Sequence, residues 1–265
     1  MTGPLVSIIT VCHNSIKTVS ETIQSVHSQI YPNIEYIIID GASTDGTLEL
    51  INSFPKGIAK FISEPDSGMY EAINKGIRLA TGDIVGILNS DDLFFDNDVI
   101  GRIAEAFVHW EIDAVYGDVQ FVKDSDSTKV VRYYSSRNFH PGRFRYGFMP
   151  AHPTFYVRRE LFEKFGYYRE DYSIAADFEL LLRFILLNKI RCKYLKGPMV
   201  FMRTGGISNR SVMSNLILNK EIIRASRENG MRTNYFNIYS KYFLKIFEFM
   251  PKLNQSVQNP DNWQR

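Results

Sequence analysis

Short apolar runs alternate with amphipathic segments along the first 110 residues. Residues 5–12 and 34–40 are continuous runs rich in β-branched side chains, which is typical of strands buried on both faces. Between these runs, Val19, Ile23 and Val26 recur at helical spacing and indicate an amphipathic helix. The pattern therefore predicts a βαβ unit at the start of the chain.

The same alternation continues to the end of this region. We predict a helix over 46–54, a strand over 59–64, a helix over 69–80 and a strand over 84–88. Four strands that alternate with three helices predict a mostly parallel sheet with right-handed crossovers. The expected fold class is therefore α/β, with a Rossmann-like central sheet flanked by helices.

The pattern changes after residue 110. Residues 114–122 and 128–134 predict the two strands of a hairpin, because a polar turn separates them. Further helices are predicted at 159–165, 177–188, 211–228 and 234–249. The second half of the chain therefore differs in organisation from the first.

This change suggests a division of the chain. We expect one main domain over 1–207, with 1–110 and 111–207 as its two parts. A C-terminal helical appendage would follow over 208–255. The final residues, 256–265, are polar and predict a disordered tail.

Composition and charge narrow the possible function classes. The chain has 31 basic and 29 acidic residues, well interspersed, so its net charge of +2 does not argue for a nucleic-acid partner. Cys12 and Cys192 follow no metal-binding spacing and fit free thiols in a reducing compartment. The N-terminal run lacks a basic n-region, and nowhere do about 18 apolar residues occur together. We therefore expect a cytoplasmic protein without a signal peptide or a membrane-spanning helix.

Polar side chains follow three of the predicted parallel strands, at 13–15, 40–46 and 89–92. In such sheets the carboxyl ends of the strands meet at one edge, where ligands bind. Asp91 and Asp92 are adjacent carboxylates that repel each other, and a dication would remove this conflict. Hard oxygen ligands with room for phosphate oxygens suit Mg²⁺ or Mn²⁺ that holds a diphosphate. The alternative is that this segment only forms a turn that caps the next helix.

A further carboxylate lies at the start of a predicted helix. The apolar stripe of this helix consists of Phe178, Leu181, Leu182 and Ile185, which places Asp177 in the first turn. The helix dipole stabilises an aspartate there, so a capping role is the default interpretation.

Three segments together carry a resemblance to a known family. Residues 6–47, 63–92 and 175–183 resemble the family 2 inverting glycosyltransferases, and the likeness extends over 5–207. The resemblance implies the GT-A fold, a nucleotide-diphosphate sugar as donor, with a UDP-sugar favoured over a GDP-sugar, and Mn²⁺ or Mg²⁺ as cofactor. Among these enzymes the chain looks most like small bacterial ones that extend lipid-linked O-antigen, capsule or colanic acid. Transfer to an undecaprenyl-linked saccharide at the inner face of the cell membrane is therefore expected.

The resemblance also assigns roles to individual positions. The nucleotide sugar would be bound by Thr10, Val11, Asn14, Asp40, Gly41, Asp66, Gly68, Asn74, Lys75 and Asp91. Asp40 matches an acid that helps to read the nucleobase, but many relatives have a second acid where this chain has Gly41, so uridine and guanosine both stay open. Asp91 and Asp92 match the metal and ribose motif, in which the last aspartate ligates the ion. The alternative for the segments before the second and third helices is that they form turns and helix caps.

By the same resemblance, Asp177 matches the catalytic base, which takes the proton of the attacking acceptor hydroxyl. The departing diphosphate is already a stabilised anion, so one base and one metal suffice for inverting transfer. His152 occurs in a context that matches the acceptor cleft, although a lone histidine is equally well explained by a structural role. The parts 1–110 and 111–207 would then bind the donor and the acceptor, respectively.

The segment 232–252 bears on partners. One predicted helical face carries Tyr235, Tyr239, Tyr242, Phe243, Ile246 and Phe247, and it is flanked by Lys241, Lys245 and Lys252. A basic, aromatic, amphipathic helix can lie on an anionic membrane surface. The same stripe could instead pack on the catalytic domain or form a homodimer, so these alternatives stay open.

Other function classes fit the sequence less well. A sugar-phosphate nucleotidyltransferase needs a glycine-rich loop after the first strand, and a dehydrogenase needs G-x-G-x-x-G there, but residues 10–19 contain no glycine. A non-catalytic sugar-nucleotide-binding protein would keep the donor pocket and would not need Asp177. Substitution of that aspartate therefore separates an enzyme from a sensor.

Overall fold

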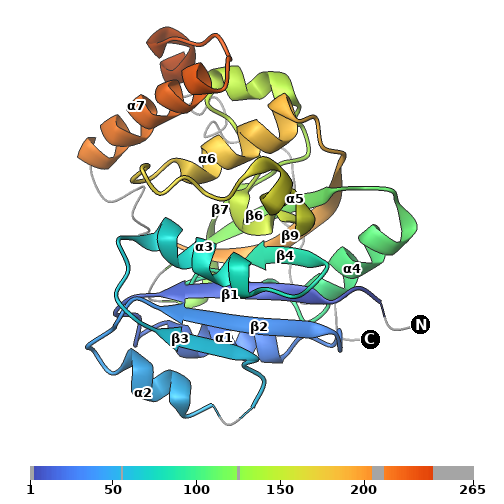
Figure 1. Cartoon of the computed structure of the whole chain (residues 1–265), viewed down its shortest axis with the longest axis vertical. Coiled ribbons are helices and arrows are strands. Elements are labelled where there is room, and N and C mark those ends of the chain that lie inside the picture. The colour runs from blue at the N-terminus through green and yellow to red at the C-terminus, as the bar shows by residue number, and fades with distance from the viewer. Residues whose placement is uncertain (1–2, 55, 124–125, 205–211, 241–265) are drawn as a thin grey trace.

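The computed structural model describes residues 3–54, 56–123, 126–204 and 212–240. Within these residues one mixed sheet runs through the molecule, and helices cover both of its faces (Figure 1). The strands are β1 (Val6–Cys12), β2 (Ile34–Asp40), β3 (Lys60–Ser63), β4 (Ile84–Ile87), β5 (Leu93–Phe94), β6 (Ala114–Lys123), β7 (Asp126–Tyr134), β8 (Tyr156–Arg158) and β9 (Cys192–Arg203).

The helices follow the chain order around this sheet. The α-helices are α1 (Val19–His27), α2 (Thr47–Asn52), α3 (Met69–Leu79), α4 (Val99–His109), α5 (Glu160–Phe165), α6 (Ala176–Leu181) and α7 (Val212–Glu228). Shorter helices are the 3₁₀ segments η1 (Pro141–Tyr146) and η2 (His152–Thr154) and the π-helical η3 (Leu182–Leu187). Residues 235–240 are also helical.

The strand order in the sheet is β3-β2-β1-β4-β8-β6-β9-β5, and β7 pairs with β6 at the side. The first four strands in this order are parallel to one another. β8 runs antiparallel to both β4 and β6, whereas β6 and β9 are parallel. The mostly parallel α/β sheet expected from the sequence is therefore confirmed, and β8 joins the parallel part to the second half of the chain.

The burial of β1 explains its continuous apolar sequence. Ile9 and Val11 pack into the core on the α3 side of the sheet, whereas Val6 and Ile8 pack into the core on the α1 side. All four side chains are at most 7% exposed. Burying an aliphatic side chain of this size contributes about 1.5–3 kcal/mol, so both faces of this strand stabilise the fold.

Several elements, among them α4, β5 and the short helices η1 and η2, were not predicted from the sequence. The helix α4 has its buried side chains at helical spacing, so the signal was present but was not recognised. The strand β5 has two residues and pairs with β9, more than 100 residues later, which no local pattern reveals. The helix expected over 177–188 forms, but its second half, η3, is π-helical.

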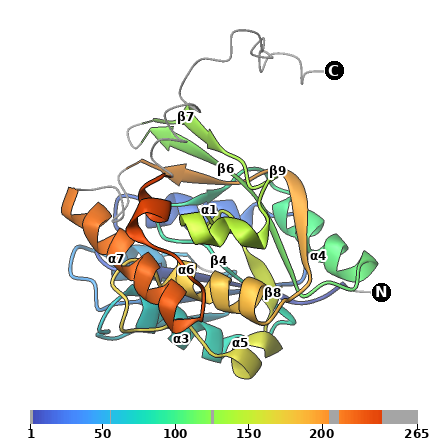
Figure 2. The same cartoon turned by 90° about the horizontal axis from the view of Figure 1, so that it is seen from above.

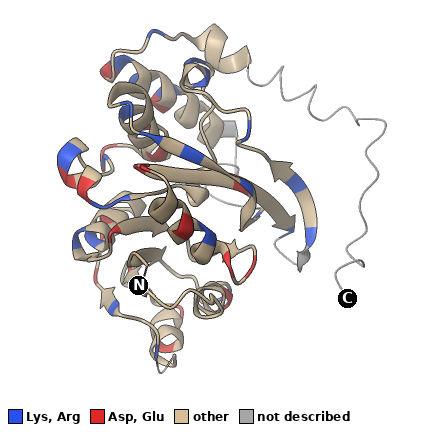
Figure 3. Cartoon of the chain, turned by 90° about the vertical axis from the view of Figure 1, so that its right-hand side faces the viewer, with Lys and Arg blue, Asp and Glu red and all other residues tan. Residues whose placement is uncertain are grey.

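The helix α7 packs against α6, and the two lie side by side in Figures 1 and 2. Of the helix predicted over 234–249, residues 235–240 are helical, and the remainder lies outside the described residues. Among the residues that the structure describes, no helix combines the length and the apolar character needed to cross a membrane. Lys, Arg, Asp and Glu are distributed over several elements (Figure 3).

Candidate active site

The acidic doublet lies in the short connection between β4 and β5. Asp92 donates its backbone N–H to the carbonyl oxygen of Asn89 at 3.0 Å, which closes a tight turn. The hydroxyl of Thr22, on α1, donates to the backbone oxygen of Asp92 at 2.9 Å. The hydroxyl of Thr10, on β1, donates to the backbone oxygen of Leu88 at 2.8 Å. Two neighbouring elements therefore hold the backbone of this turn.

The two aspartates differ in exposure. Asp92 is only 1% exposed, while Asp91 is partly exposed. Burial and the neighbouring charge of Asp91 raise the pKa of Asp92 well above its usual range, against the opposing effects of Asn89 and of the Arg203 guanidinium. The negative charge of this pair is therefore costly, and a cation at this position would relieve the cost.

The donor set of the doublet can be compared with that of a metal centre. Within the described part of the chain, no cluster of three or more His, Cys, Asp or Glu side chains could hold a metal ion. Asp91 and Asp92 offer hard carboxylate oxygens, the ligand type of Mg²⁺ and Mn²⁺. Such an ion typically keeps one or two carboxylates and takes phosphate and water oxygens for its remaining positions. The pair therefore fits an ion that is shared with a diphosphate.

The loops after β1 and β2 meet beside this turn. The hydroxyl oxygens of Ser15 and Ser90 lie 2.9 Å apart, which joins the loop after β1 to the doublet. Asn14 donates its backbone N–H to the Ser43 hydroxyl at 2.8 Å, and its side-chain oxygen accepts the N–H of Thr44 at 2.9 Å. The three polar clusters predicted at the strand ends therefore lie together at one edge of the sheet.

The backbone of this region is conformationally unusual. Asn14 has a φ of 52° and Ala42 a φ of 57°, in the left-handed region that residues other than glycine rarely adopt. Such conformations cost of order 1–3 kcal/mol and are found preferentially at binding sites. Val11, at the end of β1, is 7% exposed, so its side chain belongs largely to the core.

Asp40 is fully buried at the end of β2. Its carboxylate accepts hydrogen bonds from the hydroxyls of Ser43 at 2.5 Å and Ser63 at 2.6 Å, and from the Ser43 N–H at 3.0 Å. Burial alone would raise the pKa of this carboxyl, but the hydrogen bonds outweigh it and hold the pKa below its usual range. Asp40 is therefore ionised at neutral pH and fixes the loop that follows β2.

Gly41 lies close to Asp66. A Cβ atom at Gly41 would lie 2.6 Å from Oδ2 of Asp66, so the Asp66 side chain would have to shift to make room for it. A second carboxylate at this position would also face the charge of Asp66. The sequence could not reveal this, because Asp66 lies 25 residues further along the chain.

The remaining predicted donor residues lie around the start of α3. Gly68 precedes the helix and donates its N–H to Asp66 at 3.0 Å. Lys75 forms ion pairs with Glu64 and Glu71, both at 3.0 Å. The side-chain amide of Asn74 contacts the loop before α6. Its nitrogen donates to the backbone oxygen of Tyr168 and to Oε1 of Glu170, and its oxygen accepts the N–H of Tyr168.

Asp177 lies in the first turn of α6, as predicted. Its Oδ1 accepts the N–H of Phe178 at 2.7 Å, and its Oδ2 lies 3.1 Å from Nδ1 of His152. Burial raises the pKa of Asp177 above its usual range, and the nearby His152 opposes this effect. The Asp177 side chain is 15% exposed and the His152 side chain 37%, so the histidine is the more accessible member of the pair.

The helix η2 connects the two acidic centres. His152 is its first residue, and η2 packs against both β4, which leads to the doublet, and α6, which carries Asp177. Ser136 and Thr154 hold this segment in place: the Ser136 hydroxyl accepts the N–H of Ala151, and the Thr154 hydroxyl accepts the N–H of Gly117. The geometry therefore brings His152 and Asp177 together.

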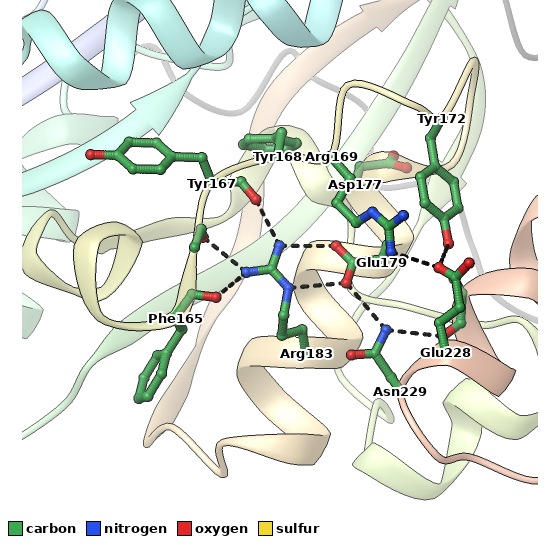
Figure 4. A network of polar contacts seen from close by, with 12 residues as sticks. Phe165, Tyr167, Tyr168, Arg169, Tyr172, Asp177, Glu179, Arg183, Glu228 and Asn229 are labelled. Atoms are coloured by element: carbon green, nitrogen blue, oxygen red, sulfur yellow. Dashed lines mark hydrogen bonds and ion pairs between the residues drawn. The ribbon is translucent and has the colours of Figure 1, made fainter.

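A buried ion pair between Glu179 and Arg183 stabilises the position of α6. Glu179 and Arg183 are 2% and 14% exposed in their side chains and lie 2.9 Å apart, and Arg183 also donates to the backbone oxygens of Phe165, Gly166 and Tyr167 (Figure 4). Removing one partner of a buried pair typically costs about 3–5 kcal/mol. This pair therefore ties α6 to the loop that precedes it.

Two residues in contact with the start of α6 were not identified from the sequence. Tyr70, on α3, donates its hydroxyl to the backbone oxygen of Ile174 at 2.6 Å. Glu221, on α7, accepts three backbone N–H groups of the same loop. Both residues belong to helices that were predicted, but contacts over 104 and 46–48 residues leave no local signal in the sequence.

Comparisons with solved structures agree on the fold. The first 349 residues of Staphylococcus aureus TarS superpose with a TM-score of 0.64 at 17% identity, covering 93% of this chain and 72% of that chain. The mannosyltransferase PcManGT from Pyrobaculum calidifontis, in complex with GDP-Man and Mn²⁺, gives a TM-score of 0.62 at 20% identity over 91% of this chain and 70% of that chain. The expected GT-A fold is thus confirmed.

Sequence comparisons identify the family. An uncharacterized glycosyltransferase of Mycobacterium tuberculosis is 33% identical over 196 residues, which is 72% of this chain and 73% of the relative. A PGL/p-HBAD biosynthesis glycosyltransferase of the same species is 30% identical over 224 residues, 80% of this chain and 82% of the relative. The sequence profile of Glycosyl transferase family 2 matches residues 7–166. The chain therefore belongs to glycosyl transferase family 2.

Proposed function

We propose that this glycosyltransferase moves a sugar from a nucleotide-diphosphate sugar, with inversion, to a hydroxyl of a lipid-linked saccharide acceptor. The observation that carries the proposal is the pair of acidic centres, Asp92 after β4 and Asp177 at the start of α6, with η2 in contact with both elements. Asp92 and Asp177 both have a pKa raised mainly by burial, and η2 packs between the elements that carry them. Carboxyl groups with perturbed pKa values are typical of active sites.

Asp177 is the proposed general base. In an inverting transfer the acceptor oxygen attacks the anomeric carbon, the bond from that carbon to the diphosphate oxygen breaks, and the diphosphate leaves with the bonding electrons. The hydroxyl proton passes to the carboxylate of Asp177, and this transfer typically contributes ~10² to 10⁴ in rate. A raised pKa makes the carboxylate a stronger base, and it also means that activity falls as the pH is lowered through this pKa. His152 lies beside Asp177 on the proposed acceptor side.

The donor would be held at the other acidic centre. We assign Asp91 and Asp92 to Mn²⁺ or Mg²⁺, and the strand-end loops around Asn14, Asp40 and Asp66 to the nucleotide. A bound ion supplies positive charge that stabilises the developing charge on the departing diphosphate. The protein's own contribution is the fixed turn of the doublet, which Thr10 and Thr22 anchor.

The nucleotide is proposed to be a UDP-sugar rather than a GDP-sugar. Among structural relatives, TarS is described in complex with UDP-GlcNAc and PcManGT with GDP-Man and Mn²⁺, so the fold accommodates both classes. A thermal-shift panel of UDP-, GDP- and dTDP-sugars with Mn²⁺ tests the proposal. At a hundredfold excess over Kd, a bound donor should raise Tm by about 5–10 °C, because it binds only the folded protein.

The same panel, repeated with EDTA, tests the cation. We expect the stabilisation by the matching donor to disappear with the chelator and to return when excess Mn²⁺ or Mg²⁺ is added. A panel in which no nucleotide sugar changes Tm would remove the proposed donor class. An unchanged shift in EDTA would remove only the metal.

We further propose that the enzyme acts in the cytoplasm, at the inner face of the membrane, on an undecaprenyl-linked acceptor. A relative that is named as a PGL/p-HBAD biosynthesis glycosyltransferase supports a biosynthetic role for this chain. Most of the proposed membrane segment, 232–252, lies outside the described residues. In the described part, Phe236 is 83% exposed and Tyr235 51% exposed, which suits insertion of aromatic side chains at a lipid surface.

The proposed membrane contact predicts that vesicle binding falls when the exposed aromatic side chains are removed. Changing Tyr235 and Phe236 together to serine should lower co-sedimentation with phosphatidylglycerol vesicles several-fold, because it removes the exposed aromatic surface. Val131→Ser, on the exposed side of β7, is the matched control, since Val131 is 52% exposed. Equal sedimentation of the double variant and the control would exclude membrane binding by this segment.

A further inference from the structure

The loop between α5 and α6 determines where the helix of Asp177 begins. The first N–H groups of any helix have no partner within the helix and need acceptors from elsewhere. Ala175 is the N-cap residue of α6, and no side-chain hydrogen bond of its own caps the helix. Within the helix, Oδ1 of Asp177 accepts the N–H of Phe178, whereas the backbone before Ala176 is held by other parts of the fold.

Glu221, in the middle of α7, binds the backbone directly before this helix start. Its Oε1 accepts the N–H of Ser173 at 2.7 Å, and its Oε2 accepts the N–H groups of Ile174 at 2.9 Å and Ala175 at 2.8 Å. One carboxylate thus binds three consecutive backbone N–H groups. Hydrogen bonds to an ionised acceptor are stronger than neutral ones, so this contact fixes the backbone two residues before Asp177.

The opposite side of the same peptide is held by α3. The Tyr70 hydroxyl donates to the backbone oxygen of Ile174 at 2.6 Å, and Tyr70 is 5% exposed. The peptide group between Ile174 and Ala175 is therefore bound through its N–H by Glu221 and through its oxygen by Tyr70. A peptide bound at both ends has little freedom to rotate.

Further contacts of α7 hold the earlier part of the loop. Glu228 accepts hydrogen bonds from Arg169 at 2.7 Å and from the Tyr172 hydroxyl at 2.8 Å (Figure 4). Arg224 donates to the backbone oxygen of Asp171 at 3.0 Å and pairs with its carboxylate. These contacts lie five or more residues before Asp177, whereas the Glu221 contacts lie directly before it.

We propose that Glu221 is a positioning residue, which aims the carboxylate of Asp177 at the acceptor hydroxyl by fixing the backbone of 173–175. The inference rests on the proposed role of Asp177 as the base. α7 would then do more than pack against α6, because its Glu221 side chain would set the geometry of the proton transfer.

The charge of Glu221 matters as well as its shape. An amide in its place offers only one acceptor oxygen and would turn its own N–H groups toward backbone donors. The groups that face Asp177 are His152 on η2, Tyr70 on α3, Tyr168 in the loop and Glu221 on α7. Of these, Glu221 contributes negative charge, so its loss makes Asp177 easier to ionise.

Glu221→Gln tests the proposal in the full-length chain. We expect kcat to fall ~10- to 100-fold, because a misplacement of about 1 Å can cost this much in rate. The KM for the donor should stay within about twofold, since the donor site is untouched, and the acid limb of the kcat profile should move to lower pH. Glu105→Gln, on the exposed side of α4, is the matched control and should behave as the wild type.

Glu228→Gln distinguishes the positioning of Asp177 by Glu221 from a general weakening of the contact between α7 and the loop before α6. It weakens the contact between α7 and the same loop, but further from Asp177, so it should cost less in kcat and leave the acid limb in place. Equal losses and equal pH profiles in the two variants would show that α7 merely stabilises the loop. Wild-type kcat in Glu221→Gln would also overturn the inference.

Two further variants complete the test. If Glu221→Gln does not fold, as judged by circular dichroism, Glu221→Asp is measured instead: it keeps the charge but reaches fewer N–H groups, so kcat should fall while the acid limb stays at the wild-type pH. Full kcat in Glu221→Asp would then overturn the inference. Asp177→Asn shows which proposal has failed, because wild-type turnover in that variant removes the base itself, whereas an inactive Asp177→Asn beside a fully active Glu221 variant removes only the positioning role.

Discussion

Replacing Asp177 with asparagine is expected to lower kcat by ~10² to 10⁴ and to leave the affinity for the nucleotide sugar unchanged. Asparagine has the same shape and can still accept the N–H of Phe178, so the start of α6 should stay intact. It cannot take a proton from the acceptor hydroxyl, so only the chemical step suffers. Initial rates and isothermal titration with donor and Mn²⁺ measure the two quantities separately.

The stability of this variant gives a second, independent measurement. Burial raises the pKa of Asp177 in the folded protein, so the folded state binds the proton more tightly than the unfolded chain does, and stability is lost as the pH rises above the unfolded pKa. Asparagine removes this loss, so the variant should have an equal or higher Tm at pH 7 and no advantage at pH 3. Asp98→Asn, with a side chain 48% exposed, is the control. Turnover of Asp177→Asn at the wild-type rate would refute the assignment of the base.

Changing Asp92 to asparagine should abolish the stabilisation of donor binding by Mn²⁺. Charge stabilisation by a metal is worth several kcal/mol, so the loss in kcat/KM should be on the order of 10² to 10³. Asp92 is the more buried member of the doublet, and its raised pKa shows that its charge is strongly disfavoured without a cation. Donor titrations with and without Mn²⁺ measure the effect.

The free Asp92→Asn protein should also be more stable than the wild type at neutral pH. The folded-state pKa is raised, so the cost in stability appears once the pH exceeds the unfolded pKa and is absent at pH 3. The variant should therefore lose activity while its Tm rises, as is typical where a binding site lowers the stability of the protein. A variant that retains Mn²⁺-dependent donor binding would show that the ion is held elsewhere.

Much of the fold could be predicted because its signals are local. The strands β1 and β2 are buried on both faces, and their continuous apolar runs show this in the sequence. The doublet lies shortly after β4, and Asp177 directly precedes an apolar stripe, so both could be located by counting along the chain. These features depend on neighbouring residues only.

The parts that escaped prediction depend on contacts between distant residues. A side chain at Gly41 would meet the carboxylate of Asp66, and Asn74 holds Tyr168, 94 residues away. In the sequence, Glu221 is an ordinary acidic residue on a predicted helix. Only the tertiary structure shows that its carboxylate accepts three backbone N–H groups. The sequence therefore predicted which element carries a side chain, but it did not predict which distant residues that side chain contacts.

The pairing of β5 has a consequence for the order in which the molecule is made. The doublet lies between β4, which pairs with β1, and β5, which pairs with Val200 and Phe201 of β9. One flank of the proposed cation site can therefore form early during synthesis on the ribosome, whereas the other must wait until about 110 more residues have emerged. A nascent chain that ends before β9 would carry the two aspartates on a turn anchored at one side, so the proposed binding of a nucleotide diphosphate would begin only after β9 has been made.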